Sequence, residues 1–145
     1  MQGKVIAINT SDKKGVRKKP VPEARINADF GIEGDAHASG DWHRQVSLLA
    51  LESIAKMQAK GLDVGPGDFA ENITTEGIDL PSLPIGTKLT LGDGIEGEVS
   101  QIGKVCHNRC AIYYQAGDCV MPKEGIFIKV LKGGTLKEGD TIKVL

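Results

Sequence analysis

Thiols and basic side chains are concentrated in one short segment of the chain. The segment contains Cys106, His107, Arg109 and Cys110, with Lys104 before them and Cys119 after them. A cysteine thiolate is a soft ligand that suits zinc, iron–sulfur clusters and other transition metals. A neighbouring cation lowers the pKa of a thiol and so raises its thiolate fraction. Lys104, His107 and Arg109 are the candidate cations, so one interpretation is a reactive or metal-ligating thiolate at Cys106.

Two other interpretations of the cysteines stay open. The first is a zinc site formed by Cys106, His107, Cys110 and Cys119, although the spacing does not match the usual paired zinc ligands and adjacent Cys and His ligands are geometrically awkward. The second is that one or more of them is a small buried hydrophobe. For Cys110 and Cys119 the structural and functional interpretations have equal support, and residue chemistry alone does not decide the role of Cys106.

A glycine-rich stretch, residues 31–45, holds a second group of candidate residues. It contains two of the three histidines, His37 and His43, together with Asp35, Asp41 and Arg44. Such groups could bind a metal, move protons or hold a polar ligand. The alternative is a surface loop in which the aspartates form turns. His37, with Asp35 nearby, is the better functional candidate, and His43 is the weaker one.

Two further polar stretches have simpler structural explanations. Asn72 could offer donors and acceptors to a heterocycle, but its spacing favours a residue that braces a turn. Residues 13–20 are rich in lysine and arginine, and their composition favours a solvated loop over an anion-attracting surface. The chain has no P-loop, G-x-S-x-G or H-E-x-x-H motif, so nucleotide hydrolysis, serine hydrolase and zincin chemistry have little support.

The sequence predicts that short strands separated by turns position these residues. The chain has 145 residues and 19 glycines, which predicts one domain, residues 1–145, of mostly β structure. One helix is expected over residues 51–60, with Met57 as a core filler, and a hairpin turn at residues 92–94. We predict a closed or partly closed β-barrel with one or two short helices. Strands are expected near residues 5–8, 24–26, 45–49, 72–75, 89–91, 95–102, 125–131 and 141–145.

Composition excludes several classes of partner and points to the cytoplasm. The net charge of -1, the pI of about 6.3 and the 4% aromatic content argue against nucleic-acid binding. No apolar run is long enough to span a bilayer, and the first residues do not read as a secretory leader. Three cysteines exclude a complete disulfide framework. We therefore expect a cytoplasmic protein without a nucleic-acid or membrane partner.

Taken in order, these segments resemble the MOSC domain, named for the C-terminal domain of molybdenum cofactor sulfurases. The resemblance covers nearly the whole chain, and it is the order and spacing of the motifs that makes it specific. Val105 stands where members commonly have proline. The motifs are residues 34–37 (GDAH), 44–49 (RQVSLL), 66–74 (PGDFAENIT), 85–89 (IGTKL), Cys106, 125–127 (GIF), 133–134 (GG) and 139–140 (GD).

This resemblance implies a β-barrel that handles the molybdenum cofactor, a molybdopterin. Cys106 matches the family cysteine that ligates molybdenum or carries sulfur. His37 and Asp35 would line the substrate side, and Asn72 would contact the pterin. Arg44, Lys104, Arg109 and residues 13–19 are candidates for the cofactor phosphate. No pyridoxal phosphate is expected, because the chain lacks the aminotransferase-like part of full sulfurases.

Three functions follow from these expectations. The leading one is molybdenum-cofactor binding, with reduction of N-hydroxylated substrates as an extension by family analogy. The second is a non-enzymatic carrier of the cofactor or its sulfur. The third is a zinc-stabilised β-barrel binding module. Partners would be molybdenum cofactor biosynthesis proteins or molybdoenzymes, with a redox donor for an enzyme, and the sequence does not identify an oligomeric state.

Overall fold

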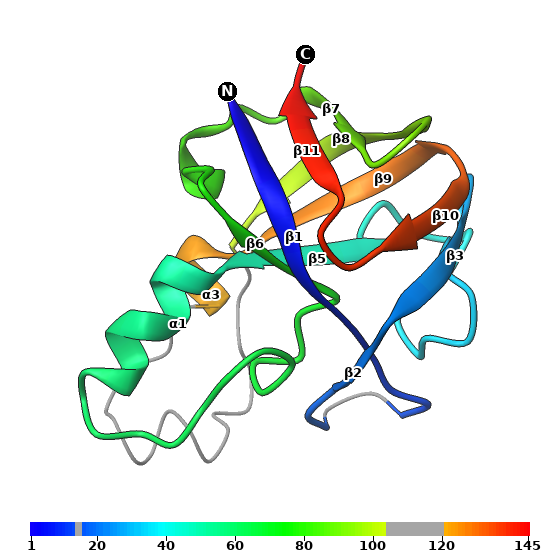
Figure 1. Ribbon diagram of the computed structural model, residues 1–145. Coiled ribbons are helices and arrows are strands. Elements are labelled where there is room, and N and C mark those ends of the chain that lie inside the picture. The colour runs from blue at the N-terminus through cyan, green and yellow to red at the C-terminus, as the bar shows by residue number, and fades with distance from the viewer. Residues whose placement is uncertain (14–15, 104–120) are drawn as a thin grey trace.

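The computed structural model of the chain describes residues 1–13, 16–103 and 121–145 (Figure 1). Helical elements are short: α1 (Leu51–Gln58), α3 (Met121–Glu124) and the 3-10 turn η1 (Leu80–Ser82). The remaining elements are the strands β1 (Gln2–Thr10), β2 (Lys19–Val21), β3 (Glu23–Asn27), β4 (Gly31–Ile32), β5 (Val46–Ala50), β6 (Ile73–Glu76), β7 (Lys88–Leu91), β8 (Ile95–Ile102), β9 (Ile126–Lys132), β10 (Gly134–Lys137) and β11 (Thr141–Val144).

Seven of these strands form a closed barrel. They follow the order β11-β7-β8-β9-β5-β6-β1, and β1 pairs with β11 to close the ring. Every pair in the ring is antiparallel except β5 with β6, which is parallel. Parallel neighbours need a crossover connection, and here α1 lies in it. The predicted mostly β barrel with short helices is confirmed.

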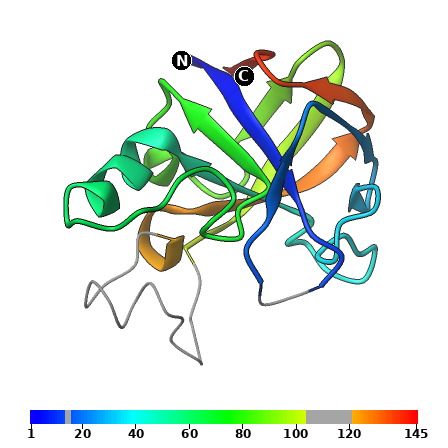
Figure 2. The ribbon, with the colours of Figure 1, turned by 60° about the horizontal axis from the view of Figure 1, so that its bottom comes forward.

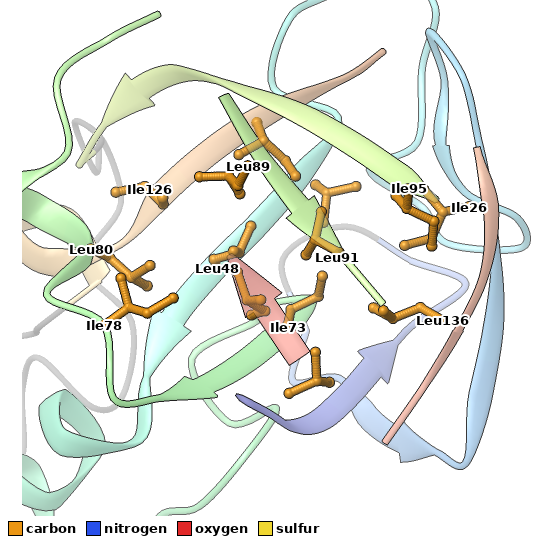
Figure 3. Packing of buried hydrophobic residues seen from close by; sticks show 14 of the residues in the cluster. Ile26, Leu48, Ile73, Ile78, Leu80, Leu89, Leu91, Ile95, Ile126 and Leu136 are labelled. Carbon is orange, nitrogen blue, oxygen red and sulfur yellow. The ribbon is translucent and has the colours of Figure 1, made fainter. Parts of the chain in front are cut away.

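Apolar side chains from alternate strand positions fill the barrel (Figure 3). In β8, residues 95, 97 and 99 are buried while residues 96, 98 and 100 are partly exposed, as a strand with one buried face requires. A second, smaller core lies against α1 and consists of Leu49, Ile54, Met57, Val64 and Phe69. Met57 is 1% exposed, which confirms its predicted role as a core filler.

The two chain ends lie together at one end of the barrel (Figure 1). At the other end, the last residues of β1, the start of β2, the 33–45 stretch and the 60–72 connection come together, as Figure 2 shows from below. Three short strands were not predicted: β2, which pairs with the end of β1, β4, inside the expected glycine-rich loop, and β10, which pairs with β3. In the parts of the chain that the structure describes, no helix combines the length and apolar character that crossing a bilayer would require.

Candidate functional site

A buried ion pair joins the start of β2 to the 33–45 stretch. Lys18 Nζ lies 2.7 Å from Asp35 Oδ1, and the two side chains are 0% and 1% exposed. Lys18 Nζ also donates to Ser11 Oγ at 3.0 Å. The backbone N–H groups of Ser11 and His37 donate to the two Asp35 carboxylate oxygens, at 3.1 and 3.0 Å. The expected solvated loop at residues 13–20 is therefore wrong for Lys18.

Lys18 faces inward just before β2 begins. It is buried, whereas its neighbours Arg17 and Lys19 are exposed. The Lys18 N–H donates to Gly67 O at 2.8 Å, which holds the segment against the 60–72 connection. Composition alone could not reveal which lysine of the basic run faces inward.

The partners of Asp35 keep its carboxylate ionised. Burial alone would raise its pKa, but the Lys18 hydrogen bond, the Ser11 N–H, the Lys18 charge and a hydrogen bond with Asn72 outweigh burial. The pKa of Asp35 therefore lies below its ordinary value of 3.8. A carboxylate that stays ionised can hold the Lys18 cation in a fixed position. The catalytic role suggested for Asp35 stays a prediction.

His37 lies at the surface beside this carboxylate. Its side chain is 38% exposed, and its Nδ1 is 3.9 Å from Asp35 Oδ2. A histidine that is reachable from solvent and adjacent to a fixed carboxylate can exchange a proton with a ligand bound outside. The structure thus places His37 and Asp35 together, as the sequence suggested, and leaves the proton-handling role of His37 as a prediction.

Asn72 connects the ion pair to the barrel strands. Its Oδ1 accepts from the Ser47 N–H at 3.0 Å and from Ser47 Oγ at 3.2 Å, and its Nδ2 donates to Asn9 O at 3.3 Å. The residue is 1% exposed. Asn72 therefore braces β1, β5 and the Asp35 carboxylate, which is a wider role than the turn expected from spacing. Its contact with a pterin stays a prediction.

Glu71 belongs to the same buried polar network as Asn72, and Asn9 links the two residues. Its Oε1 accepts from the Gly67 and Phe69 N–H groups at 3.1 and 3.3 Å, and its Oε2 accepts from Thr74 Oγ1 at 2.7 Å. Burial raises the pKa of Glu71 above 4.5, although these hydrogen bonds partly oppose the shift. Asn9 donates to Glu71 O and to Thr74 Oγ1, while its own buried Oδ1 has no hydrogen-bond partner within the described residues.

Replacing Glu71 by glutamine should change how stability depends on pH. A carboxyl whose pKa is raised by folding contributes stability below its ordinary value of 4.5, and this contribution is lost as pH rises through the folded-state value. Glutamine cannot ionise. We expect the free energy of unfolding of Glu71→Gln, minus that of the wild type, to increase as pH rises from 4.5, as measured by urea unfolding.

The matched control for this prediction is Glu23→Gln, at an exposed position of β3. It should reproduce the wild-type pH profile. A difference between Glu71→Gln and the wild type that stays constant from pH 4.5 to 8 would show that ionisation of Glu71 is not linked to folding.

The guanidinium of Arg44, just before β5, lies over two aromatic rings. Its guanidinium carbon is 3.6 Å from the centroid of Trp42 and 5.2 Å from that of Phe127 in β9. Trp42 is 51% exposed, and its ring meets the ring of His43 edge-on at 5.6 Å. Partial burial lowers the pKa of Arg44. The Nδ1 atom of His43 is buried and has no hydrogen-bond partner within the described residues. The role of Arg44 at a cofactor phosphate stays a prediction.

The predicted thiol site cannot be placed relative to these groups. Lys104, Cys106, His107, Arg109, Cys110 and Cys119 all lie outside the described residues. Within residues 1–13, 16–103 and 121–145, no group of three or more His, Cys, Asp and Glu side chains could hold a metal ion. The sequence analysis overlooked Asn9, Ser47 and Thr74, and it included Lys18 only as part of the basic run of residues 13–19. The available signal for Asn9 and Ser47 was a polar residue in or beside an apolar strand.

Comparison with known proteins gives one family and several solved structures. The sequence model described as "MOSC domain" matches residues 35–143. The YuaD protein of Bacillus subtilis has a similar structure, with a TM-score of 0.83 at 19% identity, over 99% of this chain and 96% of that one. YiiM from Geobacillus stearothermophilus has a TM-score of 0.72 at 18% identity, over 99% of this chain and 75% of that one. YiiM from Escherichia coli has a TM-score of 0.71 at 20% identity, over 100% of this chain and 70% of that one. No curated protein sequence matches.

Proposed function

We propose that this chain, which belongs to the MOSC domain family, binds the molybdenum cofactor, with Cys106 ligating molybdenum or carrying sulfur. The family is linked to this cofactor. The matched region, residues 35–143, contains Asp35, Arg44, Asn72 and Cys106. Cys106 lies three positions in sequence after Gly103, which follows β8 and ends the described range 16–103.

One observation carries the proposal: a buried network of charged and polar side chains, which includes the 2.7 Å Lys18–Asp35 ion pair, lies at one end of the barrel. Asp35, Glu71 and Arg44 all have shifted pKa values, and hydrogen bonds link Asp35, Asn72, Asn9 and Glu71 in one buried network. Shifted groups cluster at functional sites. The other described groups with a shift, Lys56 and Glu124, form an ion pair whose lysine is 63% exposed.

The donor groups present suit a cofactor with a phosphate and a soft metal. The planar guanidinium of Arg44 can bind a phosphate through two parallel N–H bonds, and a Cys106 thiolate is a fitting ligand for the metal. When bound, the cofactor would supply two-electron redox chemistry at molybdenum. The buried network would hold the loop that carries His37 and Arg44 in one geometry, so that neither side chain has to be ordered when a ligand binds.

His37 is the described side chain best placed to exchange protons with a substrate. It faces solvent, while Asp35 behind it stays ionised and is held by Lys18. Reduction of an N-hydroxylated compound consumes protons as well as electrons, and the exposed part of the His37 imidazole would deliver one of them, while its buried Nδ1 lies on the side of Asp35. This extension depends on analogy with the family. A carrier that passes on the cofactor or its sulfur would use the same binding groups without turnover.

Purification from a host that makes molybdenum cofactor tests the proposal. We expect molybdenum, measured by mass spectrometry, and pterin, measured by the fluorescence of its oxidised form, at about one each per chain. Multiple turnover of an N-hydroxylated compound with an electron donor would identify an enzyme, and single transfer to an apo-molybdoenzyme would identify a carrier. Stoichiometric zinc without pterin would overturn the proposal in favour of a zinc-stabilised barrel.

A further inference from the structure

We propose that the segment joining β1 to β2 is the docking surface for an acidic electron-donor protein. This basic hairpin, residues 12–19, would offer Lys13, Arg17 and Lys19 as positive contacts and Val16 as an apolar one. The assignment of a donor as the partner rests on the proposed function in its enzymatic form, because only turnover consumes electrons. The charge, the exposure and the fixed base of the hairpin do not depend on that function.

Positive charge is concentrated in the basic hairpin. Residues 12–19 contain five of the 18 lysine and arginine side chains of the chain and only one of its 19 aspartate and glutamate side chains. Because the whole chain has a net charge of -1, the remainder is net negative and the hairpin is a positive pole. A surface with one sign of charge attracts a protein of the opposite sign and raises the rate of their association.

The outward cations of the hairpin are available to a partner. Lys13 and Lys19 are exposed, and neither forms an ion pair in the parts of the chain that the structure describes. Arg17 lies 3.6 Å from Asp68, and its side chain is 53% exposed. Solvent screens such an exposed pair, so a carboxylate of a partner could replace Asp68 at little cost.

The base of the hairpin is fixed by contacts to two other segments. Lys18 Nζ lies 2.7 Å from Asp35 Oδ1, and the Ser11 N–H donates to the same oxygen at 3.1 Å. The Lys18 N–H donates to Gly67 O at 2.8 Å. A surface that is already ordered loses less conformational entropy on binding than a solvated loop would. The buried lysine of the basic run therefore holds the exposed ones in place for a partner.

An apolar side chain lies among these cations. Val16 is 43% exposed and directly precedes Arg17. Protein interfaces combine an apolar centre with a polar rim, and opposite charges fix the orientation of the two partners. One valine with three cations provides only a small contact of this kind. Complexes between electron carriers are small and weak, below about 1,200 Å² of buried surface, so a single hairpin suits this class of partner.

A donor is required because the substrate does not supply the electrons for its own reduction. Converting an R–NH–OH group to R–NH₂ breaks the N–O bond, takes up two electrons and two protons, and releases water. A one-electron donor must dock twice in each turnover, which requires a contact that dissociates rapidly. The basic hairpin lies at the same end of the barrel as the 33–45 stretch (Figure 2), and the Ala36 N–H donates to Ser11 O at 2.8 Å.

An acidic protein fits this surface better than a nucleic acid or a membrane does. Nucleic acids and anionic membranes are extended, so they would also face the net negative remainder of the chain. Aromatic side chains, on which unpaired bases stack, make up only 4% of the residues. A compact acidic partner can contact the hairpin alone.

Reduced plant-type ferredoxin, a small acidic one-electron carrier, is the probe for this surface. For cofactor-loaded protein, turnover of the N-hydroxylated compound with ferredoxin is divided by turnover with reduced methyl viologen, which is too small to need a docking surface. We expect this ratio to fall at least about tenfold, at an ionic strength of about 0.01 M, in the triple variant Lys13→Gln, Arg17→Gln, Lys19→Gln. The difference from the wild type should disappear at about 1 M salt, where the Debye length is about 3 Å.

The matched control changes three exposed lysines on other strands. The triple variant Lys132→Gln, Lys137→Gln, Lys143→Gln, on β9, β10 and β11, removes the same net charge and should keep the wild-type ratio. Equal ratios in the two triple variants would overturn the docking surface. So would a wild type that turns over with methyl viologen and not with ferredoxin.

Three other outcomes assign the result to an alternative. Absence of turnover with both donors, in wild-type protein that carries molybdenum and pterin, would overturn the enzymatic form of the proposed function and the donor surface with it. Loss of pterin from the hairpin variant would assign its cations to the cofactor. Binding of duplex DNA or phosphatidylserine vesicles at about 0.15 M salt, if it is lost in the hairpin variant, would replace the acidic protein by an extended polyanion.

Discussion

Replacing Lys18 by methionine is expected to lower the free energy of unfolding by about 3–5 kcal/mol. The Lys18–Asp35 pair is 2.7 Å long, and its side chains are 0% and 1% exposed. Methionine has a similar length and no charge, so it leaves the Asp35 carboxylate buried without its cation. The two backbone N–H groups that donate to Asp35 cannot replace a full charge. Urea unfolding near neutral pH measures this loss directly.

Two further variants separate burial of the charge from loss of packing. Lys18→Met combined with Asp35→Asn removes both charges and should recover part of the lost stability, because no charge is left buried and the asparagine oxygen can still accept one of the two backbone N–H groups. Lys56→Met breaks a pair of nearly equal length, 2.8 Å, whose lysine is 63% exposed, and should cost much less stability than Lys18→Met, because solvent screens an exposed pair. Equal losses for Lys18→Met and Lys56→Met would contradict the buried-pair interpretation.

The same ion pair should make the protein sensitive to acid. A carboxyl whose pKa is lowered on folding contributes stability above its ordinary value of 3.8, and this contribution is lost as pH falls toward the folded-state value. The contribution of Asp35 therefore has the opposite pH dependence to that of Glu71.

Replacing Gly67 by alanine is expected to cost about 2–5 kcal/mol, combining a left-handed backbone penalty of about 1–2 kcal/mol with about 1–3 kcal/mol of overpacking. Gly67 has φ +88°, and an added Cβ would collide with Lys18 O and lie 3.3 Å from Asn9 Cγ. The backbone of residue 18 cannot move away easily, because its N–H donates to Gly67 O. Urea unfolding would measure the loss.

Gly61→Ala is the matched control for this variant. Gly61 has nearly the same φ, +89°, but an added Cβ there would meet nothing within 4 Å. It should therefore show only the backbone penalty of about 1–2 kcal/mol. If the two alanine variants lost the same stability, the close approach of Gly67 to Lys18 and Asn9 would be unimportant. A larger loss for Gly67→Ala would confirm that this contact helps to hold the site.

Much of the fold was predictable because its strongest local signals agree with the final packing. The hairpin turn at residues 92–94 contains Gly92 and Gly94, both at positive φ, between β7 and β8. The helix begins at Leu51 as expected and ends at Gln58, two residues before the predicted end, ahead of Gly61 at φ +89°. The strand β10 was missed because its four residues begin with glycine and show little alternation of polarity.

The candidate site was only partly predictable, because its organisation depends on contacts between distant segments. Asp35 and His37 are close in sequence, and their proximity could be expected from the loop alone. Lys18 and Asn72 meet Asp35 only because β1, β2 and the end of the 60–72 connection converge at one end of the barrel. The stacking of Arg44 on Phe127 joins residues far apart in sequence, and no local pattern predicts it.

The central claim is tested most directly by the molybdenum and pterin content of Cys106→Ala and Cys119→Ala, purified side by side with the wild type. We expect molybdenum in Cys106→Ala to fall more than about tenfold, because loss of even an outer partner of a metal ligand reduces metal affinity 10- to 100-fold. Cys119→Ala should keep the wild-type content, and urea unfolding of all three proteins shows whether any loss of molybdenum follows from a loss of folding. Wild-type levels of molybdenum in Cys106→Ala would contradict the assignment of this cysteine as the ligand.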